Sequence, residues 1–169
     1  MPIPAFLAAA LAALDIVPVC VEHPPLRTVA DAEMHWDKLA GMAVKNLFIK
    51  DAGKQYWLVV LPAERSIDPK LLAPIIGSRR ISFGSAEDLA AILGVAPGAV
   101  TPLAAINDRA NQVRIVLHAA MLDAPAVLVH PLVNTATLIL PPQDLLRFLA
   151  AHGAAPAILD LSAAFRALE

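Results

Sequence analysis

The stretch at residues 44–61 reads VKNLFIKDAGKQYWLVVL and contains two runs typical of β-strands, at 44–50 and 55–61. The residues between the two runs, 51–54, include Gly53. Two strand-like runs joined by a short loop that contains glycine are typical of a β-hairpin. We therefore expect an antiparallel pair of strands in this stretch.

Helical and strand-like patterns alternate on both sides of this hairpin. Apolar residues at helical spacing predict helices at 4–14, around Met34 to Leu39, and at 69–76, 85–93 and 141–149. Short apolar runs predict further strands at 16–21, 81–83, 113–117, 126–130 and 137–140, and a short apolar segment follows at 158–159. Because hairpin-like and crossover-like connections both occur, we expect one α/β domain over residues 1–169, with a mixed β-sheet flanked by helices.

Capping and breaking residues set the expected ends of these segments. Asp31 is the expected N-cap of the second helix, and Asp68 is the expected N-cap of the third, with Pro69 at the first helical position. Gly94 is expected to end the fourth helix. Residues 97–102 read PGAVTP, and we expect a constrained loop there because proline fixes φ while glycine relaxes it.

The composition limits the class of protein. The chain has 169 residues, of which 58% are hydrophobic and 17% charged, and a formal net charge of −2. A chain of this length can form a core without disulfide or metal staples. The single cysteine, Cys20, excludes an internal disulfide and any CxxC site, and its apolar surroundings predict a small buried side chain.

The mean hydropathy of +0.64 raises the question of a membrane segment. A spanning helix needs about 20 mostly apolar residues in a row, whereas Asp15 and Pro18 interrupt the first apolar stretch and His130 and Asn134 interrupt a later one. The apolar run at 6–14 has no basic residue before it, unlike a signal peptide. We therefore expect a soluble, cytoplasmic protein with no membrane partner.

Most catalytic signatures are absent from the sequence, and Lys45 is the first candidate for chemistry. Alternation along its strand places Lys45, Leu47 and Ile49 on one face, so the lysine lies at the margin of a buried face. The amine either reaches solvent at a sheet edge or points into a pocket, where it would hold a phosphate, a carboxylate or an oxyanion. Both interpretations stay open at this point.

His130 is the second candidate, at the end of an apolar strand and directly before Pro131. It is either an ordinary strand-end histidine or a polar group at the mouth of a pocket, which Asn134 and Thr135 would also line. The basic residues are either solvated surface charge or a patch for nucleic acid; they are Lys50, Lys54, Lys70, Arg79 and Arg80. Trp36 and Trp57 are expected in or near the core.

Four short motifs follow one another along the chain: KNLFIKD at 45–51, YWLVV at 56–60, GAVTP at 98–102 after Gly94, and HPLVNT at 130–135. Their order and spacing resemble the YbaK/ProRS-associated editing domains over nearly the whole chain. That family consists of trans-acting aminoacyl-tRNA deacylases related to the insertion domain of bacterial prolyl-tRNA synthetases. The KNLF sequence is similar to the branch of free-standing Ala-tRNA(Pro) deacylases. His118 departs from the pattern, since many relatives have aspartate there.

The resemblance implies a site made of several segments. Lys45 matches the lysine that the family needs for activity, Gly98 and Pro102 match its G-x-x-x-P loop, and Asn46 and His130 match polar pocket residues. The predicted catalytic group is therefore Lys45, Gly98 and His130. The predicted substrate-binding group is Asn46, Ile49, Ala99, Val100, Thr101, Pro102 and Asn134, with Ile49 and residues near Val44 and Leu58 as the apolar wall. Lys50, Arg79 and Arg80 are the predicted phosphate contacts.

The implied function is proofreading. A synthetase pocket built for proline cannot strongly exclude alanine, because one methylene is worth only about 1–3 kcal/mol, and a second, smaller site removes the error. The implied partners are the acceptor stem and terminal adenosine of tRNA(Pro), together with prolyl-tRNA synthetase; no DNA, metal or cofactor is expected. The alternatives are a Cys-tRNA(Pro) deacylase, a catalytically silent module that binds tRNA or a synthetase, and an enzyme that uses Lys45 as a Schiff-base nucleophile.

Overall fold

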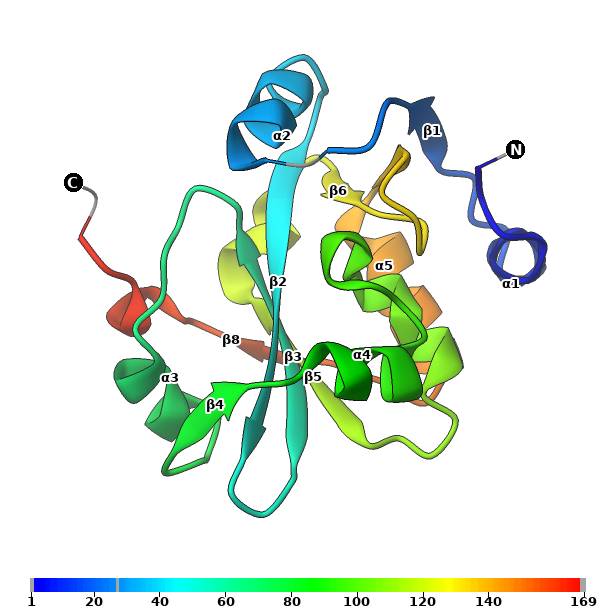
Figure 1. The fold of residues 1–169 in the computed structure, drawn as a ribbon. Helices are drawn as coiled ribbons and strands as arrows, with labels where there is room; N and C mark the ends of the chain where they lie inside the picture. The colour runs from blue at the N-terminus through cyan, green and yellow to red at the C-terminus, as the bar shows by residue number, and fades with distance from the viewer. Residues whose placement is uncertain (1, 27, 168–169) are drawn as a thin grey trace.

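A computed structural model describes residues 2–26 and 28–167, and within them eight strands form one sheet (Figure 1). The strands are β1 (Val19–Glu22), β2 (Met42–Asp51), β3 (Tyr56–Pro62), β4 (Ile81–Phe83), β5 (Val113–His118), β6 (Val127–Val129), β7 (Ala136–Leu140) and β8 (Ala157–Leu159). The α-helices are α1 (Ala5–Ala13), α2 (Val29–Trp36), α3 (Pro69–Ile75), α4 (Ala86–Leu93) and α5 (Pro142–Ala151). Short 3-10 helices are η1 (Pro97–Ala99), η2 (Pro102–Asn107), η3 (Ala119–Asp123) and η4 (Ser162–Ala164).

The sheet is mixed, which confirms the predicted α/β class. Its strands follow the order β1-β7-β6-β2-β3-β5-β8, and β4 also pairs with β2. The predicted hairpin is the antiparallel pair β2–β3, whereas β2–β6, β3–β5 and β5–β8 are parallel. Parallel neighbours require crossover connections; α3 and α4 lie in the connection from β3 to β5, and α5 lies in the connection from β5 to β8.

Two apolar clusters form on the opposite faces of this sheet. Helices α1, α4 and α5 contribute Leu11, Leu93 and Phe148 to the first cluster. Helix α3 and the C-terminal segment contribute Leu72 and Leu161 to the second. In Figure 1, α4 and α5 lie on one side of the strands and α3 lies on the other. The helices therefore cover both faces, as predicted.

Alternation along β2 divides its side chains between the two clusters. Val44 and Phe48 belong to the first cluster, whereas Ile49 belongs to the second and Leu47 packs against it. Lys45 has the same parity as Leu47 and Ile49 and is half-buried. The predicted position of Lys45, at the margin of a buried face, is thus confirmed.

Local capping explains where several helices begin and end. The Asp68 side chain accepts a hydrogen bond from the Lys70 backbone N–H at 2.8 Å, which confirms Asp68 as the N-cap of α3. Gly94 ends α4 with a φ of 64°, a conformation that glycine adopts without strain. The predicted cap of α2 is wrong: the N-cap is Thr28, whose hydroxyl accepts from the Asp31 backbone N–H at 3.0 Å.

The expected burial of Cys20 is also wrong, since its side chain is exposed. The cause is the place of β1 at one end of the sheet, where it pairs only with β7 among the described strands. An apolar local sequence predicts a strand but does not reveal that the strand will lie at the end of the sheet, where most of its residues are exposed. Trp57, in contrast, is 3% exposed, as expected for a core residue.

His118, the departure from the family pattern, has a structural environment. Its side chain is buried, and its Nδ1 accepts a hydrogen bond from the Leu161 backbone N–H at 3.1 Å. The ring also meets Phe165 edge-on at 5.0 Å between ring centroids. His118 therefore fastens the C-terminal segment to β5. No helix within residues 2–26 and 28–167 is long and apolar enough to cross a membrane.

Candidate active site

The site is built around a gap on one edge of β2. On one edge, β2 pairs with β3 along residues 44–50. On the other edge it pairs with β6 only at Met42 and Ala43, and with β4 only at residues 49–51. Residues 44–47 therefore face no strand on that edge, as far as the described residues extend. Figure 1 shows β2 running between β6 at one end and β4 at the other.

The backbone of Asn46 points into this gap. Ala63 donates its N–H to the Ala43 carbonyl at 2.9 Å, and Asp51 donates to the Gln55 carbonyl at 3.0 Å. In an antiparallel pair, the residues that bond across to the partner alternate with residues whose N–H and C=O point away. Odd-numbered residues of β2 thus bond to β3, and Asn46 presents its backbone groups to the open edge.

Lys45 and Asn46 leave this edge on opposite faces of the sheet. Lys45 shares its face with Leu47 and Ile49, next to the second apolar cluster. Burial lowers the pKa of the Lys45 amine from its usual value, and the nearby Glu64 carboxylate opposes that shift. The amine is thus partly desolvated, which strengthens its interaction with any anion that reaches it.

The two polar atoms of the Asn46 amide differ, since within the described part of the chain the nitrogen is hydrogen-bonded and the oxygen is not. Its Nδ2 donates to the Val100 carbonyl at 3.1 Å. Its Oδ1 is buried and has no hydrogen-bond partner among the described residues. A buried acceptor without a donor costs about 1–3 kcal/mol. The Asn46 oxygen is therefore placed to accept a hydrogen bond from a ligand.

A narrow recess lies on the Asn46 side of the sheet. Its volume is about 10 Å³, and a cavity needs roughly 10–15 Å³ to hold one water molecule. The residues that line it come from α2, β2, β6 and β7 and from the residue after β6. They are Trp36, Val44, Asn46, Leu128, Val129, His130 and Thr137. The recess therefore admits a group no larger than a water molecule or a methyl group.

His130 is oriented by a backbone carbonyl. Its Nδ1 lies 3.2 Å from the Ala136 carbonyl oxygen, which can only accept, so Nδ1 carries the proton and the neutral ring keeps a lone pair on Nε2. Burial lowers the pKa of His130; the bond to Ala136 opposes this, and the charge of His23 lowers it further. A neutral, oriented imidazole at a pocket is suited to act as a general base.

The 97–102 loop meets the 131–135 loop beside this recess. A Cβ placed on Gly98 would lie 3.6 Å from Asn134 Nδ2. Gly98 lies in the first turn of η1, where backbone N–H groups have no partner within the helix. Ala99, Thr101 and Pro102 are buried, and the Thr101 hydroxyl caps η2 by accepting from Leu103 N–H at 3.3 Å. These three residues fix the shape of the loop.

The other predicted site residues lie elsewhere. Ile49 lines an apolar hollow on the Lys45 face and does not line the recess. Lys50 forms an ion pair with Asp88 at 3.2 Å, on the opposite face from Lys45. Arg79 and Arg80 line a separate hollow beside α3. The structure thus brings Asn46, Val100, Gly98, Asn134 and His130 together, while Lys45 lies across the open edge.

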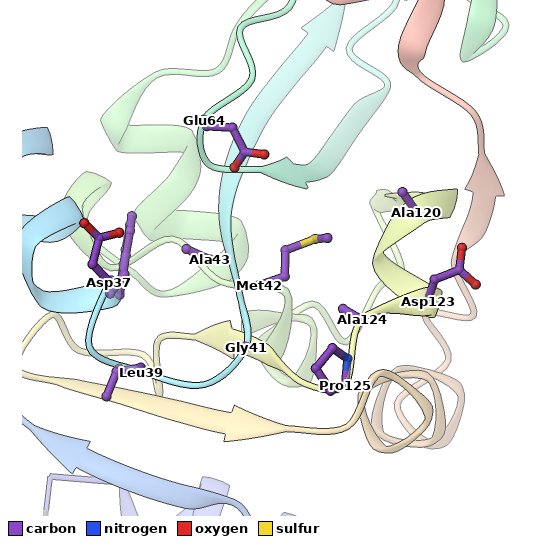
Figure 2. A pocket seen from close by; sticks show the side chains of 11 residues that line it. Asp37, Leu39, Gly41, Met42, Ala43, Glu64, Ala120, Asp123, Ala124 and Pro125 are labelled. Carbon is purple, nitrogen blue, oxygen red and sulfur yellow. The ribbon is translucent and has the colours of Figure 1, made fainter.

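A larger hollow, of about 660 Å³, is different in character (Figure 2). Three carboxylate side chains stand around it, those of Asp37, Glu64 and Asp123. Figure 2 shows Ala43 and Met42 of β2 between Asp37 on one side and Asp123 on the other. This lining repels phosphate groups, so the hollow does not suit a polyanion.

Sequence reasoning missed Trp36 and Thr137 as residues that line the recess. Trp36 ends α2 and lines both the recess and the acidic hollow. Thr137 is buried in β7, and its hydroxyl lies 2.9 Å from His23 Nε2. A threonine in an otherwise apolar strand was the available signal, since a buried hydroxyl implies a polar partner.

The aminoacyl-tRNA editing domain family matches residues 23–148. The chain belongs to this family. The match includes Lys45, Asn46, Gly98, His130 and Asn134, so every segment of the site lies within the editing domain. As an aminoacyl-tRNA editing domain the chain is an ester hydrolase, which confirms both the resemblance and the enzyme class that the sequence predicted.

Two curated relatives agree with this assignment, and one solved structure shares the fold. The prolyl-tRNA editing protein ProX of Acetoanaerobium sticklandii is 37% identical over 79% of this chain and 82% of its own. Prolyl-tRNA synthetase associated domain-containing protein 1 of Xenopus laevis is 39% identical over 90% of this chain and 94% of its own. A candidate trans-editing enzyme for prolyl-tRNA synthetase shares the editing-domain fold, with a TM-score of 0.67, 20% identity, and coverage of 93% and 98%.

Proposed function

We propose that this editing domain acts in trans on prolyl-tRNA errors and hydrolyses the ester of Ala-tRNA(Pro). The observation that carries the proposal is the size of the recess beside Asn46 and His130, about 10 Å³. An alanyl methyl group matches that space, whereas the three ring methylenes of proline exceed it. The cysteinyl side chain adds a sulfur atom to the methyl group, so the recess favours alanine over cysteine as well.

The substrate is held from both sides of the open β2 edge. Lys45 anchors the terminal phosphate or the ester oxygens on one face. On the other face, the buried Asn46 oxygen accepts a hydrogen bond from the substrate α-ammonium, which places the side chain in the recess. Gly98, whose backbone N–H lies in the first turn of η1 and so has no partner within that helix, donates to the carbonyl oxygen as negative charge develops there.

Hydrolysis needs one water molecule and one base. The Nε2 atom of His130 takes a proton from the water as its oxygen adds to the ester carbonyl carbon. The tetrahedral intermediate then breaks its bond to the ribose oxygen, and the same proton passes to that leaving oxygen. An aminoacyl ester is already activated, so positioning and oxyanion stabilisation supply most of the rate enhancement.

The direct test is deacylation of tRNA(Pro) charged with alanine, cysteine, serine or proline. We expect Ala-tRNA(Pro) to give the highest kcat/KM and Pro-tRNA(Pro) the lowest. A higher kcat/KM for Cys-tRNA(Pro) would replace the substrate assignment with the sister activity. Binding of tRNA without deacylation of any form would identify a silent binding module. Adding prolyl-tRNA synthetase to the same assay tests whether it is a partner. We expect the deacylation rate to increase when the synthetase is present.

Widening the recess should weaken the rejection of proline. Val44 lines the recess and is 5% exposed. We expect Val44→Ala to lower the kcat/KM preference for alanyl over prolyl ester by about 10–200-fold, the range that one methylene is worth in an apolar pocket. The matched control is Val59→Ala, a valine fully buried in the second cluster, which should keep the preference. Equal preferences in both variants would rule out size exclusion at this recess.

The acceptor stem is expected to contact the Arg79–Arg80 pair, which lines a hollow on the same face as Lys45, whereas Lys50 is held by Asp88 on the opposite face. Replacing Arg80 with alanine should weaken tRNA binding and reduce the slope of log K against log salt by about one. The control is Arg109→Ala, an exposed arginine in the loop after η2. Binding measured over a series of salt concentrations gives both slopes, and an unchanged slope would assign Arg80 to ordinary surface charge.

A further inference from the structure

An apolar hollow on the Lys45 face has no part in the mechanism described above. Its volume is about 60 Å³, and it is lined by Leu47, Ile49, Ile67, Pro69, Leu72, Ile81, Ser82 and Phe83. Phe83, on the edge strand β4, is 64% exposed although it is a large aromatic side chain. An exposed aromatic ring beside an apolar hollow is suited to stack against a flat ligand.

The register of the sheet places this hollow in line with Lys45. Phe83 pairs with Ile49 across β4 and β2, and Ile49 lies on the same face as Lys45. Ile49 lies four positions along the strand from Lys45, which corresponds to about 13 Å. The aromatic ring and the amine therefore stand along one strand on one side of the sheet.

The two ends of this line carry opposite charge. Beyond Phe83, a hollow of about 460 Å³ shares Pro69 and Ile81 with the apolar one. Its charged lining residues are Lys70, Arg79, Arg80 and Arg166, with Asp68 as the single carboxylate, and Asp68 caps α3. Beyond Lys45, at Ala43, lies the acidic hollow of Figure 2. A polyanion is therefore attracted at the Arg79–Arg80 end and repelled past Lys45.

We infer that Phe83 and the apolar hollow form a base-stacking subsite for the single-stranded 3′ end of the RNA that carries the ester. Sites for single-stranded nucleic acid combine a cationic groove with aromatic side chains on which bases stack. The strand enters over Arg79 and Arg80, stacks one base on Phe83, and reaches Lys45, where the ester crosses the open β2 edge to His130. This inference rests on the proposed function and adds a nucleotide-binding subsite to it.

The test compares two substrates in one set of variants. With an alanyl-RNA hairpin that keeps its unpaired 3′ nucleotides, Phe83→Ala should raise KM by about 5–150-fold, the range for loss of one stacked base. With 2′(3′)-O-alanyl-adenosine, kcat/KM should stay unchanged, because that ester lacks the preceding nucleotides. Phe83→Trp keeps an aromatic face and should retain the wild-type KM. The control is Phe6→Ala, an exposed phenylalanine on α1 that is 51% accessible.

Abasic nucleotides separate base stacking from phosphate contact. Each unpaired nucleotide is replaced in turn by an abasic one. At one position this should raise the KM of the wild type by the same factor as Phe83→Ala does with the intact hairpin. At that position Phe83→Ala should cause no further loss. An unchanged KM in Phe83→Ala, or an equal loss on alanyl-adenosine, would overturn the inference. If the wild type deacylates neither substrate, the proposed function itself fails, so the two failures are distinguishable.

Discussion

Replacing His130 with asparagine is expected to lower kcat/KM for Ala-tRNA(Pro) by about 10²–10⁴-fold, the usual contribution of a general base. Asparagine Nδ2 occupies the place of the ring Nδ1 and still donates to the Ala136 carbonyl, so the local backbone contact is retained. Only the Nε2 lone pair is lost. The measurement is single-turnover deacylation across a pH series.

The pH profile distinguishes a base from a merely structural group. Burial lowers the pKa of His130, so the base stays neutral as the pH decreases past the ordinary histidine value of about 6.5. The wild-type rate should therefore stay constant down to the lowered pKa and fall about tenfold per pH unit below it. His130→Asn should lack this limb. The matched control is His152→Asn, whose ring Nδ1 also bonds to a carbonyl, that of Phe148 at 2.8 Å, at the end of α5. A wild-type profile without the limb would contradict the assignment of the base.

The same shift has a consequence for stability. A histidine whose pKa is lowered in the folded state binds fewer protons there than in the unfolded state at acid pH. The contribution of neutral His130 to the free energy of unfolding is therefore fully present above about pH 6.5, the pKa of an ordinary histidine. It is lost as the pH falls through the lowered pKa of the folded state. The pKa of His35 is also lowered, first by burial and then by His23, so this histidine contributes with the same sign.

The local sequence predicted the elements better than it predicted their surroundings. The β2–β3 hairpin, the cap of α3 and the half-buried position of Lys45 follow from turns, caps and period-two alternation, which act over a few residues. The exposure of Cys20 depends on β1 being an edge strand, which only long-range pairing decides. The boundary of α2 shifted because Thr28 competed successfully with Asp31 for the same capping role.

The site shows the same division between local and long-range information. The motifs predicted Asn46, Gly98 and His130 together, and contacts bring their segments to one recess. The gap in the sheet could not be predicted, because it arises from where β6 stops and β4 begins on the edge of β2. Alternation already separated Ile49 from Asn46, so the placement of Ile49 on the other face follows from the strand itself.

Two adjacent residues of one strand can serve one substrate only where that strand is an edge. In a paired strand, Lys45 and Asn46 would be separated by a continuous sheet, with a neighbouring backbone between their faces. The unpaired stretch at 44–47 removes that neighbour. A ligand that crosses the edge meets a cation on one face and a polar recess on the other. The Lys45–Asn46 dipeptide is therefore a two-sided clamp, and its chemistry depends on the gap.

Replacing Lys45 with alanine is expected to lower kcat/KM by about 10²–10³-fold, the range for loss of one electrostatic contact to developing charge. The partly buried position lowers the pKa of Lys45, which means that the fold disfavours its charged form. Removal of the amine should therefore leave the melting temperature unchanged or raise it. Loss of activity without loss of stability is the combination expected of a group kept for function.

The control for this variant is Lys38→Ala, which removes an exposed lysine from the turn after α2. It should retain the wild-type rate, so a loss caused by net charge alone would appear in both variants. Lys45→Arg keeps the charge but changes its geometry, and it should recover only part of the rate because guanidinium and ammonium groups bind oxygens differently. Turnover by Lys45→Ala at the wild-type rate would show that the substrate does not cross the open edge, and the clamp would lose its cationic side.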